Sequence, residues 1–313
     1  MQGVTSDDLA GFLEDRVNLK REDVKAYRDQ VRHLRERLEL YVREHPDFAL
    51  IKMLHFGSLA KATAISTLRE MDVAVYLRAE RLSTHALHSV LETVRDLLIE
   101  VYPQMERSQF VIDPPAVTIQ FRTSGLEVDV VPVIPNGKPD DRGELALAYP
   151  EWIETSIPLH LQFIRDRAER HAHFRELVRL TKWWRQERDV PLQSFLIELL
   201  WAHLFDAGRV PDDFQEAMLA FFAYIERTRL EERIVFADNY RPAEAKPTGD
   251  LVQVIDPVTP TNNVAAHMTR VDRDAVLRAA EAALDDVAAA SSAYSKGRGI
   301  TCYQRVFGPA FVA

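Results

Sequence analysis

The sequence contains one cysteine, eleven glycines and no long hydrophobic run among its 313 residues. The single cysteine, Cys302, cannot form an internal disulfide or a thiolate metal cage, so nothing in the chain requires an oxidising compartment. No apolar stretch approaches the roughly 18 residues needed to cross a bilayer, and the first residues show no basic segment followed by an apolar one. These absences predict a cytoplasmic protein with no membrane contact and no secretory signal.

An excess of basic charge is also absent. The chain has 39 Lys and Arg residues against 48 Asp and Glu residues, which gives a formal net charge of −9. Because phosphate neutralisation supplies most non-specific nucleic-acid affinity, this balance argues against a protein that coats DNA or RNA. The net charge does not exclude a local basic groove, so we keep nucleic acid as a partner only in the role of an activator. The hydrophobic share of 47% is ordinary for a folded protein with one large domain or two modest ones.

The first half of the chain predicts a mixed β-sheet with helices on one side. Apolar residues at three- and four-residue spacings predict a long amphipathic helix over 20–45 and a second helix over 84–101. Short runs rich in β-branched and apolar residues predict strands at 71–77, 108–112, 116–121 and 126–134. The order helix, strand, helix and three strands is typical of a mixed sheet packed by helices.

The second half of the chain has a helical pattern. Proline, glycine and aspartate concentrate in 135–150, which predicts a loop and a boundary between a first domain, 1–150, and a second, 151–313. Apolar faces at helical spacing then predict helices at 173–188, 192–207, 212–229 and 271–293. The proline-rich stretch 241–263 predicts an extended connection. The fold class is therefore α+β, with a helical C-terminal domain.

Five residues in the first half combine into a chemical pattern. Gly57 and Ser58 follow an apolar run and predict a tight turn whose backbone N–H groups and hydroxyl suit a triphosphate. Glu70 and Asp72 are two apart on a predicted strand, so their carboxylates share one face. Asp129 lies inside an apolar strand, where a charge must be paired or bound to a metal. Three carboxylates make a hard-oxygen site suited to Mg²⁺, with Mn²⁺ as the alternative.

Each part of this pattern is common when taken singly. Gly-Ser pairs occur in many turns, and two acids two apart on a strand usually mark a solvated face. The combination is more specific. Two cations about 3.5 to 4 Å apart can bridge the acids and a nucleoside triphosphate, so that an attacking hydroxyl is activated and the pyrophosphate leaving group is neutralised. The order of these parts along the chain predicts nucleotidyl transfer.

The segment 57–77 resembles the active-site segment of the oligoadenylate synthetase and cyclic GMP-AMP synthase superfamily. It is most similar to the bacterial cGAS/DncV-like nucleotidyltransferases of anti-phage defence. The run LEVDVVPVI at 126–134 resembles the segment that carries the third acid of that family. The runs LVRLTKWWRQER, PLQSFLIELL and VIDPVTPTNNVA resemble its helical domain. The resemblance implies a polymerase beta-like nucleotidyltransferase core followed by an oligoadenylate-synthetase-like helical domain.

The resemblance also implies roles for particular residues. Gly57 and Ser58 would bind the donor triphosphate. The acids Glu70 and Asp72 would hold both metals, and Asp129 would complete the metal that activates the acceptor hydroxyl.

Two residues of the predicted helical domain are implied as well. Lys182 would reach the triphosphate, and Ser194 would assist it. By contrast, Asp256, Pro257, Asn262 and Asn263 are interpreted as structural, because Asp and Asn beside proline mainly fix turns.

Two positions depart from the family pattern. Most relatives have aspartate where this chain has Glu70, and the additional methylene moves the carboxylate by about 1.5 Å. Ala62 stands where the pattern has glycine. If that position requires a positive φ, alanine strains the loop by about 1 kcal/mol or more.

The function implied by the resemblance is synthesis of a cyclic di- or oligonucleotide second messenger from nucleoside triphosphates, with release of pyrophosphate. ATP is the expected substrate. A protein regulator or downstream effector is the expected partner. Two alternatives stay open. One is template-independent addition of nucleotides to the 3′ end of an RNA or tRNA, which the Glu-x-Asp pair permits and the net charge mildly opposes. The other is a nucleotide-binding scaffold whose altered loop has lost turnover.

Overall fold

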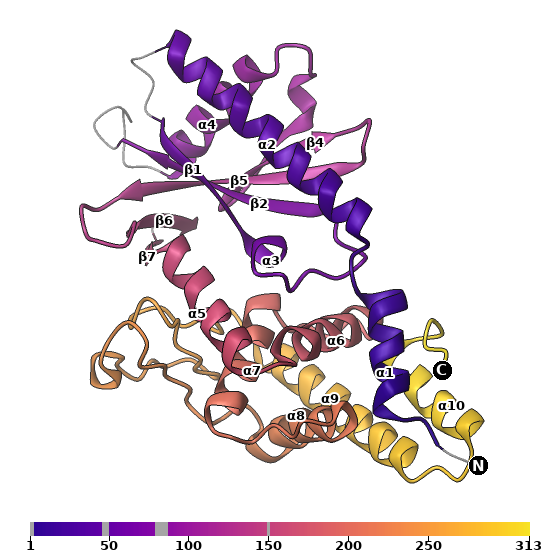
Figure 1. Cartoon of the computed structure of the whole chain (residues 1–313). Helices are drawn as coiled ribbons and strands as arrows, with labels where there is room; N and C mark the ends of the chain where they lie inside the picture. The colour runs from indigo at the N-terminus through magenta and orange to yellow at the C-terminus, as the bar shows by residue number, and fades with distance from the viewer. Residues whose placement is uncertain (1–2, 46–49, 79–86, 149–150) are drawn as a thin grey trace. The chain divides into compact units, whose positions relative to one another are not determined.

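The structure, a computed structural model, describes residues 3–45, 50–78, 87–148 and 151–313 (Figure 1). It divides into two compact units. The sheet unit consists of 19–62 and 67–162, and the helical unit consists of 1–18, 63–66 and 163–313. The largest hydrophobic core of the sheet unit lies against the sheet, and the helical unit has a separate core rich in aromatic residues.

Within the described ranges, the sheet unit is built on a seven-stranded mixed sheet in the order β1-β2-β5-β4-β3, with β6 paired to β5 and β7 paired to β6. The pairing of β2 with β5 is parallel, and the other pairings are antiparallel. The strands are β1 (Leu50–Phe56), β2 (Glu70–Leu77), β3 (Phe110–Asp113), β4 (Ala116–Phe121), β5 (Leu126–Pro135), β6 (Gly143–Ala148) and β7 (Glu151–Thr155).

Two helices, α2 (Arg21–Glu44) and α4 (Leu87–Val101), pack on one face of this sheet (Figure 1). Met71 and Val73 of β2 are fully buried in the same core as Leu34 of α2. Alternate residues of a strand point to opposite faces, so the even-numbered residues of β2 lie on the other face. The predicted strands and both predicted helices of this half are confirmed, with two exceptions. Residues 108 and 109 of the strand predicted at 108–112 belong to a 3₁₀ turn that precedes β3, and residues 84–86 lie outside the described ranges.

The helical unit consists of packed α-helices around a core of large aromatic side chains. Trp184 and Trp201 are almost completely buried, and the Trp201 ring stacks on Phe221 with 4.7 Å between centroids. The helices are α1 (Ser6–Phe12), α6 (Phe174–Glu187), α7 (Ser194–Asp206), α8 (Phe214–Thr228), α9 (Arg270–Ser291) and α10 (Lys296–Phe307). The four helices predicted in this half are therefore confirmed. The helix α5 (Ile157–Arg170) begins in the sheet unit and ends in the helical unit.

The N-terminal helix belongs to the helical unit, which the sequence did not suggest. Phe12 of α1 is 2% exposed, and its ring contacts Trp183, Phe307 and Phe311. Burial of Phe12 among these rings explains why the first 18 residues group with helices that follow them by more than 140 residues.

The prediction of a loop over 135–150 is wrong in part. The strand β6 (Gly143–Ala148) falls inside that range and extends the sheet by pairing with β5. The Pro-, Gly- and Asp-rich residues make only the turn before β6. The sheet unit accordingly extends to residue 162, whereas the sequence placed a domain boundary at 150.

The extended connection predicted over 241–263 is confirmed. Its regular structure is limited to a short 3₁₀ turn at Pro242–Glu244 and isolated bridges to Ile234 and between Ile255 and Asn263. Among the described residues, no helix combines the length and the apolar character that a membrane span requires.

Candidate active site

The register of the two parallel strands brings the predicted acids together. Asp72 of β2 lies opposite Asp129 of β5, and Glu70 lies opposite Glu127. Met71 and Val73 face the core shared with α2 and α4, so the alternating acids of β2 face the other side of the sheet. The predicted convergence of Glu70, Asp72 and Asp129 on one face is therefore what the backbone shows.

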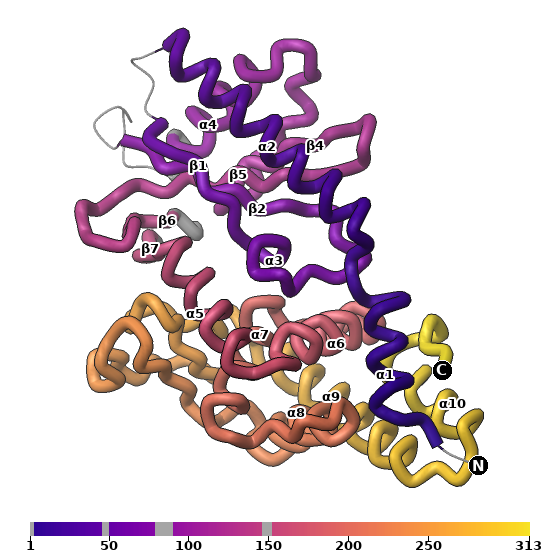
Figure 2. The backbone as a smooth tube through the Cα atoms, viewed as in Figure 1, coloured from indigo at the N-terminus to yellow at the C-terminus, as the bar shows by residue number. Residues whose placement is uncertain are grey.

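The carboxylate of Asp72 also lies against the turn that follows β1. Gly57 has a φ of 70°, and a Cβ placed on it would come within 1.7 Å of Asp72 Oδ2 and 2.4 Å of Asp72 Cγ. Glycine is therefore required here both for the backbone conformation and for the close approach. Ser58 follows directly, as the second residue of the short helix α3 (Gly57–Ala60) (Figure 2).

The electrostatics of this face favour a cation. Asp129 accepts a hydrogen bond from the Thr118 hydroxyl at 2.6 Å, which stabilises its charged form. Burial outweighs that bond and, together with the charges of Glu127 and Asp113, raises the pKa of Asp129. Burial and the charge of Asp129 likewise raise the pKa of Glu70. Ionisation of these carboxylates is therefore unfavourable in the folded protein, and a bound cation would stabilise their charged forms.

Glu127 is a further acid of this face that the sequence reasoning missed. It lies two residues before Asp129 on β5, and its Oε1 accepts a hydrogen bond from Gln120 Nε2 at 3.0 Å. The signal was available, because the period of two that places Glu70 beside Asp72 applies equally to Glu127 and Asp129.

The donor set on this face suits a divalent metal ion. Glu70, Asp72 and Asp129 supply only carboxylate oxygens, which are the ligands that Mg²⁺ and Mn²⁺ prefer. In the described part of the chain, no three acidic, histidine or cysteine side chains are grouped closely enough to hold one ion as they stand. Three observations therefore support a divalent metal ion at this site: the carboxylate donors, their shared face of the sheet, and the raised pKa values of Glu70 and Asp129.

Lys182, predicted to reach the triphosphate, is buried in the helical unit. It is 5% exposed, and its Nζ donates to Glu198 Oε1 at 2.7 Å and to Thr63 Oγ1 at 2.9 Å. Glu198 is itself 2% exposed. The sequence did not single out Glu198, whose partners are distant in the chain.

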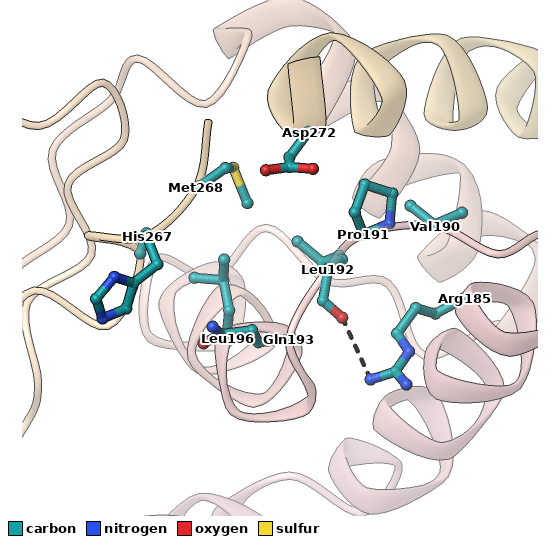
Figure 3. A pocket seen from close by; sticks show the side chains of 10 residues that line it. Arg185, Val190, Pro191, Leu192, Gln193, Leu196, His267, Met268 and Asp272 are labelled. Carbon is teal, nitrogen blue, oxygen red and sulfur yellow. Dashed lines mark hydrogen bonds between the residues drawn. The ribbon is translucent and has the colours of Figure 1, made fainter. Parts of the chain in front are cut away.

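Ser194, the second predicted residue of the helical unit, is exposed at the start of α7. Its hydroxyl accepts a hydrogen bond from Arg185 Nη1 at 3.0 Å, and the same guanidinium nitrogen lies 3.4 Å from the Leu192 carbonyl (Figure 3). Figure 3 shows this arginine at the wall of a pocket of about 350 Å³, which is also lined by His267, Met268 and Asp272. Arg185 is a third residue that sequence reasoning missed, and it places a positive charge beside Ser194.

The segment around Asp256 has contacts that match its structural interpretation. Asp256 Oδ1 accepts the backbone N–H of Val258 at 2.8 Å. Asn263 Oδ1 accepts from the backbone N–H groups of Val254 and Ala265. These side chains fix the course of the extended connection.

The sequence over residues 4–167 matches the family described as the Second Messenger Oligonucleotide or Dinucleotide Synthetase domain. The chain is 43% identical to the cyclic AMP-AMP-AMP synthase of Escherichia coli strain MS 115-1 over 97% of its own length and 96% of that protein. It is 30% identical to a CBASS oligonucleotide cyclase CdnC of E. coli strain KTE188, with 89% of each chain covered.

Solved structures agree with these similarities. The structure of E. coli MS115-1 CdnC with ATP superposes with a TM-score of 0.92 at 41% identity and covers 100% of both chains. The Vibrio cholerae DncV cyclic AMP-GMP synthase superposes with a TM-score of 0.71 at 13% identity, which shows a shared fold.

The chain belongs to the second messenger oligonucleotide or dinucleotide synthetase family. It is a nucleotidyltransferase that makes an oligonucleotide second messenger from nucleoside triphosphates, and its family is metal-dependent. The predicted enzyme class and fold class are confirmed. Family membership also favours this activity over addition of nucleotides to an RNA end.

Proposed function

We propose that the chain joins ATP molecules into a cyclic oligoadenylate, with cyclic AMP-AMP-AMP as the main product, in a CBASS anti-phage system. The observation that carries the chemistry is the shared face of Glu70, Asp72 and Asp129 beside the Gly57–Ser58 turn. The product is proposed from the 43% identity to the cyclic AMP-AMP-AMP synthase of E. coli, which extends over almost the whole chain.

In each step, a ribose hydroxyl attacks the α-phosphorus of a 5′-triphosphate. This triphosphate belongs to another ATP while the chain grows and to the linear product itself when the ring closes. A P–O bond forms to that hydroxyl oxygen, the bond to the β-phosphate bridging oxygen breaks, and pyrophosphate leaves while the hydroxyl proton is released. Glu70, Asp72 and Asp129 are proposed to hold divalent cations, Mg²⁺ or Mn²⁺. Such cations lower the pKa of the attacking hydroxyl and neutralise charge on the pyrophosphate.

The other proposed roles fall to groups of the chain itself. The Ser58 hydroxyl and the backbone of Gly57 would bind phosphate oxygens of the donor ATP, since Gly57 lies against Asp72 and Ser58 follows it directly. In the helical unit, Ser194 is proposed to donate to the triphosphate, with Arg185 holding its hydroxyl and adding positive charge. Lys182 is likewise proposed to reach the triphosphate, and its ammonium is held by Thr63 and Glu198.

A protein regulator is part of the proposal. A complex of E. coli MS115-1 CdnC with a HORMA protein has been solved, and its cyclase chain superposes on this one with a TM-score of 0.91 at 41% identity. We infer that a partner of the HORMA kind binds this chain as well. Cytoplasmic location is proposed together with this partner.

The test is a product assay with the purified chain, each nucleoside triphosphate alone and in mixtures, and Mg²⁺, Mn²⁺ or a chelator. Mass spectrometry of the phosphatase-resistant fraction should identify cyclic AMP-AMP-AMP in the ATP reaction, absent with chelator and with Asp129→Asn. A HORMA-type partner is included in a parallel reaction, so that a requirement for activation is detected. Product formation that is identical in wild type and Asp129→Asn would refute the assignment of the site.

The same assay separates the alternatives. Extension of tRNA lacking its terminal nucleotides, without a cyclic product, would identify an RNA-end nucleotidyltransferase. Calorimetric binding of ATP without turnover under any metal or partner would identify a nucleotide-binding scaffold.

A further inference from the structure

Three polar side chains meet in the interior of the helical unit, and each comes from a different part of the chain. Lys182 lies on α6, Glu198 lies on α7, and Thr63 belongs to the short segment 63–66. They are 5%, 2% and 0% exposed. We refer to Thr63, Lys182 and Glu198 as the buried triad.

The contacts of the buried triad centre on Thr63. The Thr63 hydroxyl donates to Glu198 Oε1 at 2.7 Å and accepts from Lys182 Nζ at 2.9 Å. Lys182 Nζ also lies 3.3 Å from the Thr63 carbonyl oxygen and 2.7 Å from Glu198 Oε1. Both the side chain and the backbone of Thr63 are therefore held by the ion pair.

Stability alone is a weak explanation for such a group. Desolvation of two charges is expensive, and a buried ion pair can often be replaced by apolar residues with no loss of stability. A buried pair that fixes a third residue can instead define a conformation, because every partner must be in place for its polar groups to be satisfied.

The residue that the ion pair fixes lies directly after the proposed phosphate-binding segment. Gly57–Ala62 belongs to the sheet unit, and the chain enters the helical unit at Thr63. Ala62 has a φ of 57°, a conformation that costs a non-glycine residue energy and persists only where neighbouring contacts impose it. At the other end of the segment 63–66, the Ser66 backbone N–H donates to the Val17 carbonyl at 2.7 Å.

We propose that Thr63 and Glu198, together with Lys182, are positioning residues for nucleotidyl transfer. They fix the second end of the segment that carries Ser58, while Gly57 and Asp72 fix the first end. In this assignment the Lys182 ammonium acts on Thr63 through the hydrogen bonds to its hydroxyl and carbonyl oxygens. The inference rests on the proposed role of Ser58 in binding ATP.

The test compares two buried threonine hydroxyls of the same unit. Thr63→Val removes the hydroxyl of the triad at nearly constant volume. The matched control is Thr181→Val, because Thr181 is also 0% exposed, donates to the Leu177 carbonyl at 2.9 Å and accepts from Trp201 Nε1 at 2.9 Å. Steady-state kinetics with ATP and Mg²⁺ would measure kcat and KM for wild type, both variants and Thr63→Ser.

We expect Thr63→Val to lower kcat about 10- to 100-fold with KM for ATP changed by less than about twofold, since a small misplacement of a reacting group has effects of this size. Thr63→Ser keeps the hydroxyl and should recover most of kcat. Thr181→Val should keep wild-type kcat even where its melting temperature falls. Hydrogen exchange at the Lys61 and Ala62 amides should accelerate in Thr63→Val and not in Thr181→Val.

Several results would overturn the inference. One is a Thr63→Val enzyme with wild-type kcat. Another is a Thr181→Val enzyme that loses as much kcat as Thr63→Val, which would indicate a general effect of removing a buried hydroxyl. If Thr63→Val does not fold, Glu198→Gln replaces it, and wild-type kcat in that variant is equally contradictory. A wild-type chain that makes no product in the presence of metal and partner would refute the proposed function, which is a distinguishable failure.

Discussion

The carboxylate of Asp72 occupies the space into which a side chain at position 57 would extend, since a Cβ on Gly57 would lie 1.7 Å from Asp72 Oδ2. This contact joins the end of β1 to the start of β2, where Phe56 pairs with Asp72. Because Gly57 has no side chain, the proposed metal ligand Asp72 can lie in direct contact with the proposed phosphate-binding turn.

Gly57→Ala should abolish activity through this contact. The new methyl group must displace the Asp72 carboxylate, so we expect product formation to fall about 100-fold or more. Gly125→Ala is the matched control, because Gly125 has a similar φ of 68° and a Cβ placed on it would meet nothing within 4 Å. Both variants carry the same backbone strain. Equal activity losses in the two would show that strain, and not displacement of Asp72, is responsible.

Ala62→Gly should stabilise the protein. Ala62 has a φ of 57°, and glycine adopts this conformation without the steric cost that alanine has. After allowance for the greater freedom of glycine in the unfolded chain, we expect a gain of about 0.5–1 kcal/mol in unfolding free energy. Ala60→Gly, in the right-handed helix α3, should lose stability and serves as the control. Denaturant melts measure both, and destabilisation by Ala62→Gly would contradict the interpretation.

His55 should make the protein less stable in acid. Burial and the charges of Arg28 and Arg35 lower the pKa of His55 to about 4. The unfolded chain therefore binds the proton first, and stability is lost as the pH falls from about 6.5 towards 4. His55→Leu should reduce the pH dependence of unfolding free energy in this window by up to about 1.4 kcal/mol per pH unit. The exposed His267→Leu is the control, and an unchanged slope in His55→Leu would contradict the prediction.

Asp129→Asn should raise thermal stability while it removes activity. The pKa of Asp129 is raised, so its ionised form is destabilised in the folded protein and the cost appears as the pH rises above the unfolded-state pKa. Asparagine can still accept the Thr118 hydrogen bond. We expect a higher melting temperature at pH 7.5 without added metal, at about 2–4 °C per kcal/mol recovered, and little difference near pH 3.

The control for this prediction has the opposite sign. Burial acts to raise the pKa of Asp8, but the hydrogen bonds from Thr5 and Lys296 together outweigh it and lower the pKa. Asp8→Asn should therefore lower the melting temperature at pH 7.5. If Asp129→Asn is as destabilising as Asp8→Asn, the electrostatic account of the carboxylate face is wrong.

The sequence predicted the acids of the site more completely than their surroundings. The period of two on a strand places Glu70 and Asp72 on one face without knowledge of the fold. That Asp129 lies opposite Asp72 depends on the parallel pairing of β2 with β5, and no local pattern specifies which strands become neighbours. The prediction for this pair came from the order of motifs along the chain.

Contacts between distant parts of the chain could not be predicted from the sequence. Lys182 is 119 residues from Thr63, and nothing near either residue indicates that they meet. Phe12 likewise finds its aromatic partners at the far end of the chain. Local sequence patterns predict amphipathic faces and turns, whereas the packing of whole helices and strands determines which residues contact each other.

The most direct test of the account is whether Asp72 and Asp129 bind divalent cations together. Electron paramagnetic resonance would count Mn²⁺ ions bound to the chain in the presence of a non-hydrolysable ATP analogue, for wild type and for the double variant Asp72→Asn/Asp129→Asn. Asp113→Asn serves as a control for loss of charge near this face. We expect the double variant to lose protein-dependent Mn²⁺ binding and Asp113→Asn to retain it. Undiminished Mn²⁺ binding by a folded double variant would contradict it.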